Sequence, residues 1–205
     1  MTCIVLLFLA SLLLACFTLF IQQRFRCSAR TVTDLLGILR CVDERDLEDL
    51  FDQTKEDNLS LGTPAIRFHE AQRQRARMLF EYLRRMGFNA IALLDWAYAE
   101  QKRLQGPGMA ADQEQLRTIH EIIQTGPEFR FCAAVALSKL SVLLLLEELR
   151  IVRIRCLSKL RHAAGIDGLE LYRSLVQAAV ALSAAQGSNA GAQLAALLRG
   201  SGSVS

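Results

Sequence analysis

The sequence predicts an all-α protein in which an N-terminal transmembrane helix precedes an irregular helical bundle. The chain of 205 residues has only three prolines and no segment of alternating apolar and polar residues, a pattern typical of helices rather than strands. Its hydrophobic fraction of 52% exceeds what an ordinary soluble domain needs. Phe129–Ala164 contains neither glycine nor proline, and we expect this stretch to be the long central helix around which the bundle packs.

The first apolar run, Thr2–Ile21, has 20 residues and no charge. As a helix it would span about 30 Å, the thickness of the hydrocarbon core of a bilayer. We therefore expect residues 1–23 to be a membrane anchor whose residues 2–21 contact lipid. A cleaved signal, in a lipoprotein or a secreted protein, is the alternative, although signal peptides have a basic start and a shorter apolar core. Leu13–Cys16 resembles the lipobox of bacterial lipoproteins, but the sequence stays apolar through Ile21.

The charges after the anchor predict its orientation. Arg24, Arg26 and Arg30 follow it, and no acidic residue occurs before Asp34. Positive flanks stay on the cytoplasmic side, so we expect a single-pass protein with the bulk of its chain in the cytoplasm. The six cysteines contain no CxxC pair, which favours reduced thiols in the same compartment. The predicted domains are the anchor, a helical domain over residues 24–199 and a disordered tail over residues 200–205.

The helical domain is expected to begin with a short helix capped by Thr31 and Asp34. An acidic helix should follow over residues 43–55, and a loop over residues 58–62. Residues 43–57 hold eight acidic and two basic residues, a net charge of −6. This segment lacks the central glycine and the ligand spacing of an EF-hand, so we expect no metal site there.

A basic helix is predicted next, over residues 64–86, with Gly87 ending it. Between Arg67 and Arg85 the sequence has six arginines and two glutamates, a net charge of +4. Such a stripe can bind nucleic acid, but the acidic segment beside it can neutralise it, so we expect no nucleic acid partner. Arg75 points into the apolar face and should therefore need a carboxylate partner.

Two further helices are predicted before the central one. Asn89 should cap a helix that ends near Leu104, and a second helix over residues 112–124 should end at the Gly126-Pro127 pair. Within the central helix, the leucines of Val135–Leu146 point in nearly every direction, which predicts burial on all sides.

Lys139 interrupts this apolar stretch. A second membrane span over residues 131–151 would hold its charge at the bilayer centre, at a cost of about 2.5–3.5 kcal/mol. We expect Lys139 instead to reach water or to meet an acid from another helix. Beyond it, residues 150–161 contain five basic residues and no acidic one. Two final helices are predicted over residues 169–186 and 190–199, after a break at Gly165–Gly168.

The sequence predicts no catalytic, cofactor or metal site. It has no Walker loop, no dinucleotide-binding glycine pattern, no nucleophile elbow and no zinc-binding pattern, and its three histidines lie in different predicted helices. The candidate functional residues are Lys139, Arg75 and His120.

The predicted function is a membrane-anchored helical scaffold or interaction protein, with a protein partner or a second copy of the chain. A lipid-binding helical protein at the membrane face is one alternative, and an elongated apolar cavity would indicate it. An enzyme with dispersed residues is another, and its sign would be a pocket that joins His120 or Lys139 to a carboxylate.

Overall fold

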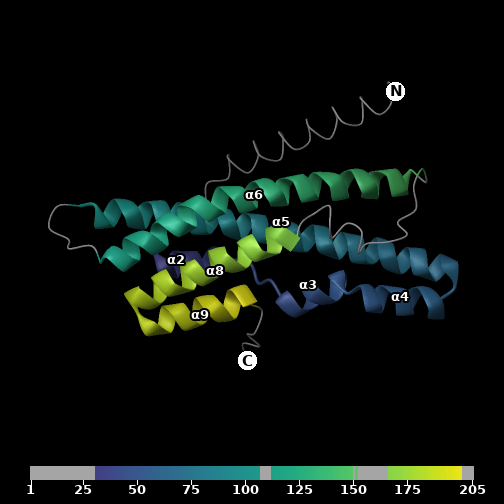
Figure 1. The fold of residues 1–205 in the computed structure, drawn as a ribbon, viewed down its shortest axis with the longest axis horizontal. Helices are drawn as coiled ribbons and strands as arrows, with labels where there is room; N and C mark the ends of the chain where they lie inside the picture. Colours follow the sequence, from purple (N-terminus) through teal and green to yellow (C-terminus); the bar gives the residue numbers. More distant parts are fainter. Residues whose placement is uncertain (1–30, 107–111, 150, 152–165, 200–205) are drawn as a thin grey trace, which may run out of the picture.

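The computed structural model describes residues 31–106, 112–149, 151 and 166–199, and over these ranges the chain is helical with no strand. The helices are α2 (Val32–Ile38), α3 (Glu44–Phe51), α4 (Gln53–Gly62), α5 (Ala65–Leu104), α6 (Gln113–Glu148), α8 (Ile166–Gln186) and α9 (Ser188–Arg199). Figure 1 shows them as an elongated bundle. The predicted all-α class and the packing around a long helix are confirmed. The predicted anchor over residues 1–23 and the tail over residues 200–205 lie outside the described residues.

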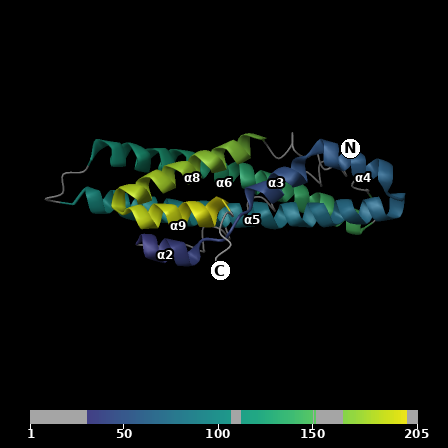
Figure 2. The same ribbon diagram turned by 90° about the horizontal axis from the view of Figure 1, so that it is seen from below.

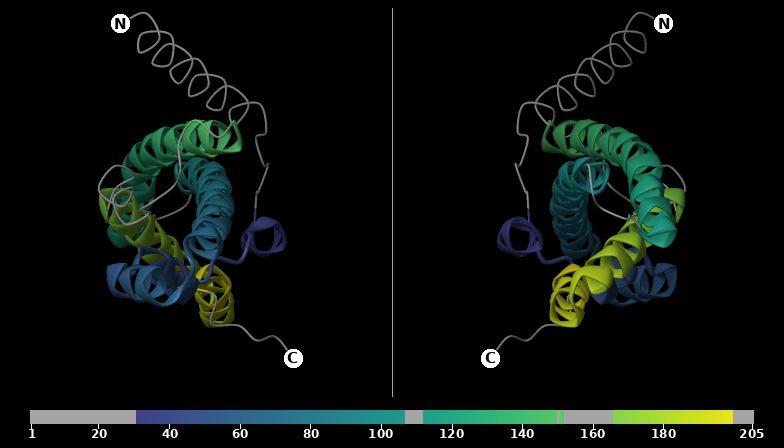
Figure 3. Two further views of the ribbon diagram at one scale, coloured as in Figure 1. Left: turned by 90° about the vertical axis from the view of Figure 1, so that its right-hand side faces the viewer. Right: turned by 90° about the vertical axis from the view of Figure 1, so that its left-hand side faces the viewer.

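The bundle is built on an antiparallel pair, α5 and α6, which run side by side along its long axis (Figure 1). At 1.5 Å per residue, the 40 residues of α5 extend about 60 Å. α8 packs on α6, α9 packs on α8, and α2 touches both α5 and α9 (Figure 2). α3 and α4 lie along the first half of α5, on the side opposite α6 (Figures 1 and 3).

The central helix differs from the prediction at both ends. α6 begins at Gln113 and runs through Gly126 and Pro127 without a break, and its last residue is Glu148, with Leu149 at its C-cap. The rest of the predicted helix, residue 150 and residues 152–164, lies outside the described residues. Pro127 is exposed, and Gly126 lets α6 approach α5 so closely that an added Cβ would lie 2.6 Å from the Leu94 side chain. Packing along two long helices outweighs the local break signal, because it buries far more surface than one lost backbone hydrogen bond exposes.

α5 is also continuous where two helices were predicted. Gly87 and Asn89, the expected end and cap, both lie buried inside it. Asn89 does not cap a helix, because its side chain hydrogen-bonds Arg40 of the segment after α2 instead. The predicted boundary at residues 87–89 was therefore wrong, and one 40-residue helix replaces two shorter ones.

The acidic region divides earlier than predicted. Asp52 ends α3 and caps α4, since its carboxylate accepts hydrogen bonds from the backbone N–H groups of Thr54 (2.9 Å) and Lys55 (3.4 Å). The expected loop over residues 58–62 is the last part of α4. The predicted start of α2 is confirmed: Thr31 Oγ1 accepts from the Asp34 N–H, and the Asp34 carboxylate accepts from the Thr31 N–H, each at 3.2 Å.

The core of the described bundle runs from Leu35 to Leu198, and Trp96, Tyr172 and Phe129 are its largest fully buried side chains. The rings of Phe129 and Tyr172 join α6 to α8, with centroids 5.2 Å apart. Burial of α6 is not uniform. Its side chains are buried on the bundle side as far as Leu140, but Leu145 is 57% exposed and Leu149 60%. The prediction that Val135–Leu146 is buried on all sides was therefore wrong.

Candidate functional site

The structure does not bring the three predicted candidates together. Lys139 and His120 are both exposed on α6, and they lie 19 positions apart, about 28 Å along the helix axis. Arg75 is half-buried on α5 and is directed toward α3. No catalytic arrangement results from these three residues.

Arg75 has a different partner from the one its position predicted. Its guanidinium donates to the backbone carbonyls of Asp49 (3.2 Å) and Leu50 (2.8 Å), close to the end of α3. The last carbonyls of a helix have no partner within it and carry the negative end of its dipole, so they can replace a carboxylate. The expected carboxylate partner was therefore wrong, and Arg75 joins α3 to α5.

The acidic segment lies along α5, but Arg73, Arg84 and Arg85 of α5 form their ion pairs with acids outside this segment. Arg84 and Arg85 both bind Glu81 of their own helix, at 2.9 and 3.2 Å. The Arg84 guanidinium chiefly holds the pKa of Glu81 below its usual value, with Arg85 adding to the effect. A carboxylate of the acidic segment does contact α5: Asp46 accepts a hydrogen bond of 2.7 Å from the Tyr82 hydroxyl. Burial, followed by this hydrogen bond, raises the pKa of Tyr82 to about 12.

A hollow of about 760 Å³ lies beside the start of α6. Its lining residues in the described part of the chain are Asp112, Gln113, Glu114, Leu116, Arg117 and His120. It therefore places His120 with two carboxylates. However, Asp112 already serves as the N-cap of α6, accepting from the Glu114 N–H at 3.2 Å. Glu114 and His120 lie six positions apart, about 9 Å along the axis. The hollow is open to solvent, so it does not exclude water from these groups.

Charged groups also lie between α5 and α6. Halfway along the pair, Arg130 is half-buried near Asp95 and Tyr98. Burial lowers the pKa of Arg130, and the negative charges of Asp95 and ionised Tyr98 partly offset this effect. At the far end, Arg73 binds Glu147 at 3.4 Å and Glu148 at 3.1 Å. Arg73 thus joins the first part of α5 to the end of α6, and Arg130 holds a charge at the boundary between the two helices.

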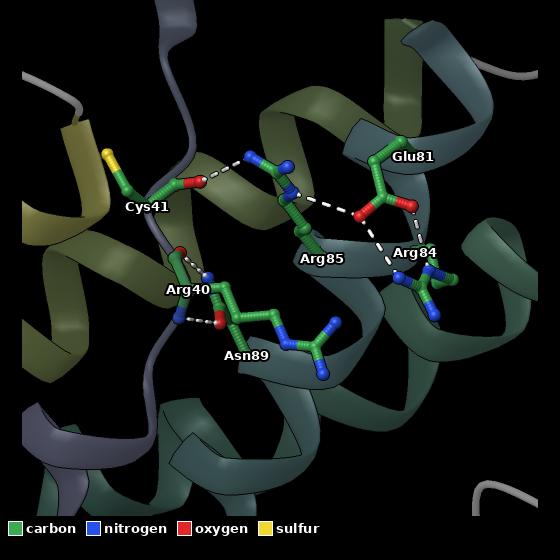
Figure 4. A network of polar contacts seen from close by, with 6 residues as sticks. All are labelled: Arg40, Cys41, Glu81, Arg84, Arg85 and Asn89. Atoms are coloured by element: carbon green, nitrogen blue, oxygen red, sulfur yellow. Dashed lines mark hydrogen bonds and ion pairs between the residues drawn. The ribbon is translucent and has the colours of Figure 1, made fainter. Parts of the chain in front are cut away.

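Asn89 and Arg85 of α5 both hold the segment that follows α2 (Figure 4). The Asn89 amide accepts from the Arg40 N–H at 2.9 Å and donates to the Arg40 carbonyl at 2.8 Å and to the Tyr172 hydroxyl at 3.1 Å. Arg85 donates to the Cys41 carbonyl at 3.5 Å, and the Arg40 guanidinium lies 4.4 Å from the centre of the Phe88 ring. These contacts attach the segment after α2 to α5 and α8. They stabilise the bundle and do not form a binding or catalytic site.

The feature of α6 that sequence reasoning missed is an uncovered apolar surface. Exposed side chains recur along its outer side, where Phe131 is 62% exposed and Leu145 and Leu149 are 57% and 60% exposed. We call the set Phe131, Val135, Lys139, Val142, Leu145 and Leu149 the outer stripe. Its spacing of three or four residues was visible in the sequence, but an apolar helix with residues in all directions conceals which side the bundle covers.

α6 is also the one helix in the described part of the chain that is long and apolar enough to cross a membrane. Only 39% of its most apolar stretch is buried inside the protein. The long apolar helix of the structure is therefore α6 and not the N-terminal run, which the described ranges do not include. Among the described residues, no three His, Cys, Asp or Glu side chains are grouped so that they could hold a metal ion.

No protein-family model, curated protein or solved structure matches this chain.

Proposed function

We propose that the protein is a membrane-anchored helical interaction protein, whose bundle acts as a scaffold at the cytoplasmic face of the membrane. The observation that carries the proposal is the outer stripe of α6, because exposed apolar side chains arranged along one helix mark an interaction surface. The uncharged run Thr2–Ile21 and the three arginines after it support a single-pass anchor with the bundle in the cytoplasm.

The polar groups of the bundle support a scaffold rather than a catalyst. Arg75, the Asn89–Tyr172 hydrogen bond and the Arg73 ion pairs all connect one helix to another. The hollow that contains His120 is the feature an enzyme would need, but its described lining comes from a single helix end and is open to water. Catalytic groups act most strongly in sites that exclude water and gather side chains from several elements.

Membrane extraction tests the proposal directly. The full chain is expressed with a C-terminal tag, and the membrane fraction is washed with alkaline carbonate, which removes peripheral proteins and leaves spanning ones. We expect the protein to stay in the pellet and its tag to be digested by protease only when the cytoplasmic face is accessible. Release by carbonate, or a tag protected on the other side, would overturn the anchor or its orientation respectively.

A matched control is available in the anchor itself. Replacing Leu12 and Leu13 with Arg places two charges near the middle of the run and leaves the described bundle unchanged. Because charged residues at the centre of a span strongly oppose insertion, this variant should appear in the carbonate supernatant.

A further inference from the structure

We propose that the outer stripe of α6 binds the same stripe of a second copy of this chain, so that two bundles associate through a symmetric pair of helices. This inference rests on the proposed function, because the anchor is what brings two copies together on one face of a membrane. It names the partner of the interaction surface.

The outer stripe has the spacing of a coiled-coil seam. Val135, Val142 and Leu149 follow one another at intervals of seven residues. Phe131 and Leu145 lie two such intervals apart, each four residues before a member of that series. This is the a and d pattern by which one helix packs against another, and it forms a narrower strip than the face with which a helix covers a broad apolar surface. The stripe therefore fits a second helix.

The stripe is open where such a helix would lie. Phe131 is 62% exposed at one end, and Leu145 and Leu149 are 57% and 60% exposed at the other. Val135 and Val142 between them are half-buried. The bundle covers the opposite side of α6 through α5 and α8, so a second helix can reach the seam without displacing either of them.

The charges of α6 favour a protein partner over an anionic lipid surface. The helix carries five glutamates and three basic side chains, an excess of negative charge that such a surface would repel. Within the stripe, Lys139 is the one charged member, and it lies beside the a and d positions rather than on them. Unlike partners select each other largely through complementary charges, and the seam positions carry none.

An apolar patch without a charge pattern is instead typical of contacts between identical chains. Interfaces of homodimers are more apolar than those between unlike proteins. Around a two-fold axis the same patch lies on both sides of the interface, so each apolar side chain of the stripe meets an apolar stripe on the other copy. A second copy of the chain therefore satisfies the seam with no further requirement on sequence.

The size of the stripe determines how strongly two copies bind. From Phe131 to Leu149 it extends about 27 Å, and a helix is about 10–12 Å wide, so its footprint is about 300 Å² on each copy. The total of about 600 Å² is below the roughly 1,000 Å² of a stable interface. The contact is therefore weak between free molecules. A shared membrane raises the effective concentration of each copy near the other, and the pair forms there.

Photocrosslinking between two full chains tests the pairing. Copies with two different affinity tags are reconstituted together in phosphatidylcholine vesicles. In one of them p-benzoylphenylalanine replaces Phe131 or Leu145, or replaces Leu61 of α4, which is 87% exposed and serves as the control. After irradiation we expect a product that carries both tags, several-fold more abundant from positions 131 and 145 than from position 61. Peptide mapping should place the attachment within residues 131–149 of the second copy.

Four results would overturn the inference. Equal yields from all three positions would show random collision, and attachment outside residues 131–149 would show a different contact. A crosslink from position 131 or 145 to residues 2–21 of the same chain would show that the N-terminal run covers the stripe. Lipid adducts alone at these positions would show that the stripe faces the bilayer.

A matched pair of variants tests the same contact without a crosslinker. Leu145→Glu combined with Leu149→Glu places charges in the seam at two exposed positions, and it should lower the co-purification of a second copy several-fold. Leu61→Glu combined with Ile66→Glu makes the same kind of change where the side chains are 87% and 84% exposed, at the turn between α4 and α5, and should leave co-purification unchanged. Equal recovery with both variants would show that the copies associate elsewhere. An unchanged circular dichroism melt verifies folding.

The carbonate experiment separates this inference from the proposed function. If carbonate releases the full chain but position 131 still crosslinks to the stripe of a second copy, the anchor is wrong and the pairing holds. If the protein resists extraction and forms no such crosslink, the anchor holds and the pairing of α6 is wrong. Release without a crosslink would show that both are wrong.

Discussion

Asn89 shows how one buried side chain determines the path of a distant segment. Its amide pairs with both backbone groups of Arg40, as a neighbouring strand would, and also binds the Tyr172 hydroxyl. These partners lie 49 and 83 residues away. Local sequence patterns carry no information on partners so distant. The sequence therefore predicted that Asn89 caps a helix, which is a local role, instead of this long-range one. The capping box of Thr31 was predictable for the opposite reason, since its partner Asp34 lies three residues away.

Replacing Asn89 with Ala should destabilise the bundle by about 3 kcal/mol, because it leaves buried backbone and hydroxyl groups without partners. Tyr172→Phe removes one of the same hydrogen bonds and should cost about 1 kcal/mol. Asn189→Ala, at an exposed site on α9, is the control and should stay within about 0.5 kcal/mol of the original chain. Urea unfolding followed by circular dichroism measures all three. Equal stability of the Asn89 and Asn189 variants would contradict a structural role for the Asn89 hydrogen bonds.

Glu81 gives the bundle a small acid-sensitive contribution. Hydrogen bonds from Arg84, and then Arg85, hold its pKa below the usual 4.5, so the ionised form is favoured in the folded state. Stability from such a group is complete above the unfolded pKa and is lost as the pH falls through the folded pKa. The pair is partly exposed, so Glu81→Gln should cost less than about 1 kcal/mol at neutral pH.

The effect is tested by the difference in melting temperature between the original chain and the Glu81→Gln variant, measured at several pH values. Melting temperatures of the original chain and Glu81→Gln should differ most at neutral pH and converge as the pH falls below 4.5. A difference that stays constant or widens in acid would show that Glu81 stabilises the bundle through something other than its charge.

The long helices show where element boundaries can be predicted and where they cannot. Gly87 and the Gly126-Pro127 pair are strong local stop signals, yet α5 and α6 continue through both sites. The reason is tertiary: Gly87 and Gly126 are buried, and Gly126 contacts Leu94 of the other helix. At position 126 glycine serves close approach rather than termination, and a sequence pattern cannot distinguish the two roles without knowing which helices pack together.

Two glycine substitutions separate these roles. Gly37 of α2 has open space around it, so Gly37→Ala should raise the free energy of unfolding by about 0.5–1 kcal/mol through backbone entropy. Gly126→Ala should instead lower it by about 1–3 kcal/mol, because its Cβ would lie 2.6 Å from the buried Leu94. Urea unfolding of both variants measures the contrast.

The double variant Gly126→Ala with Leu94→Ala completes the test. Removing the opposing side chain makes room for the new methyl group, so the two changes should cost less together than the sum of their separate costs. Strict additivity, or a stabilising Gly126→Ala, would show that α5 and α6 are not in close contact at this point.

At the scale of the whole molecule, the helical class and the packing around a long helix follow from composition and periodicity, whereas the arrangement does not. Six helices were predicted to begin between residues 31 and 149, and the described part of the chain has five there. Two pairs of predicted helices merge into α5 and α6, and the acidic region divides into α3 and α4. The side of α6 that stays exposed depends on where α5 and α8 lie, and this was not visible in a run of leucines pointing in every direction.

The independence of the bundle from the N-terminal run is testable by deletion. The core of the described chain extends from Leu35 to Leu198, and its first helix has a complete cap formed by Thr31 and Asp34. The described residues therefore include a continuous core and a complete helix start beyond the N-terminal run. Removing residues 1–23 should therefore leave a chain that unfolds cooperatively, with a melting temperature close to that of the full protein in mild detergent.

The same deletion should move the protein from the membrane pellet to the carbonate supernatant, because it removes the 20 uncharged residues that match the bilayer. Fusing an unrelated single-span helix in place of residues 1–23 is the control, and it should restore resistance to carbonate without altering the melt. If the shortened chain instead aggregates or loses its cooperative transition, and the unrelated helix fails to rescue it, then Thr2–Ile21 packs within the bundle. In that case its apolar sequence serves the core rather than the membrane.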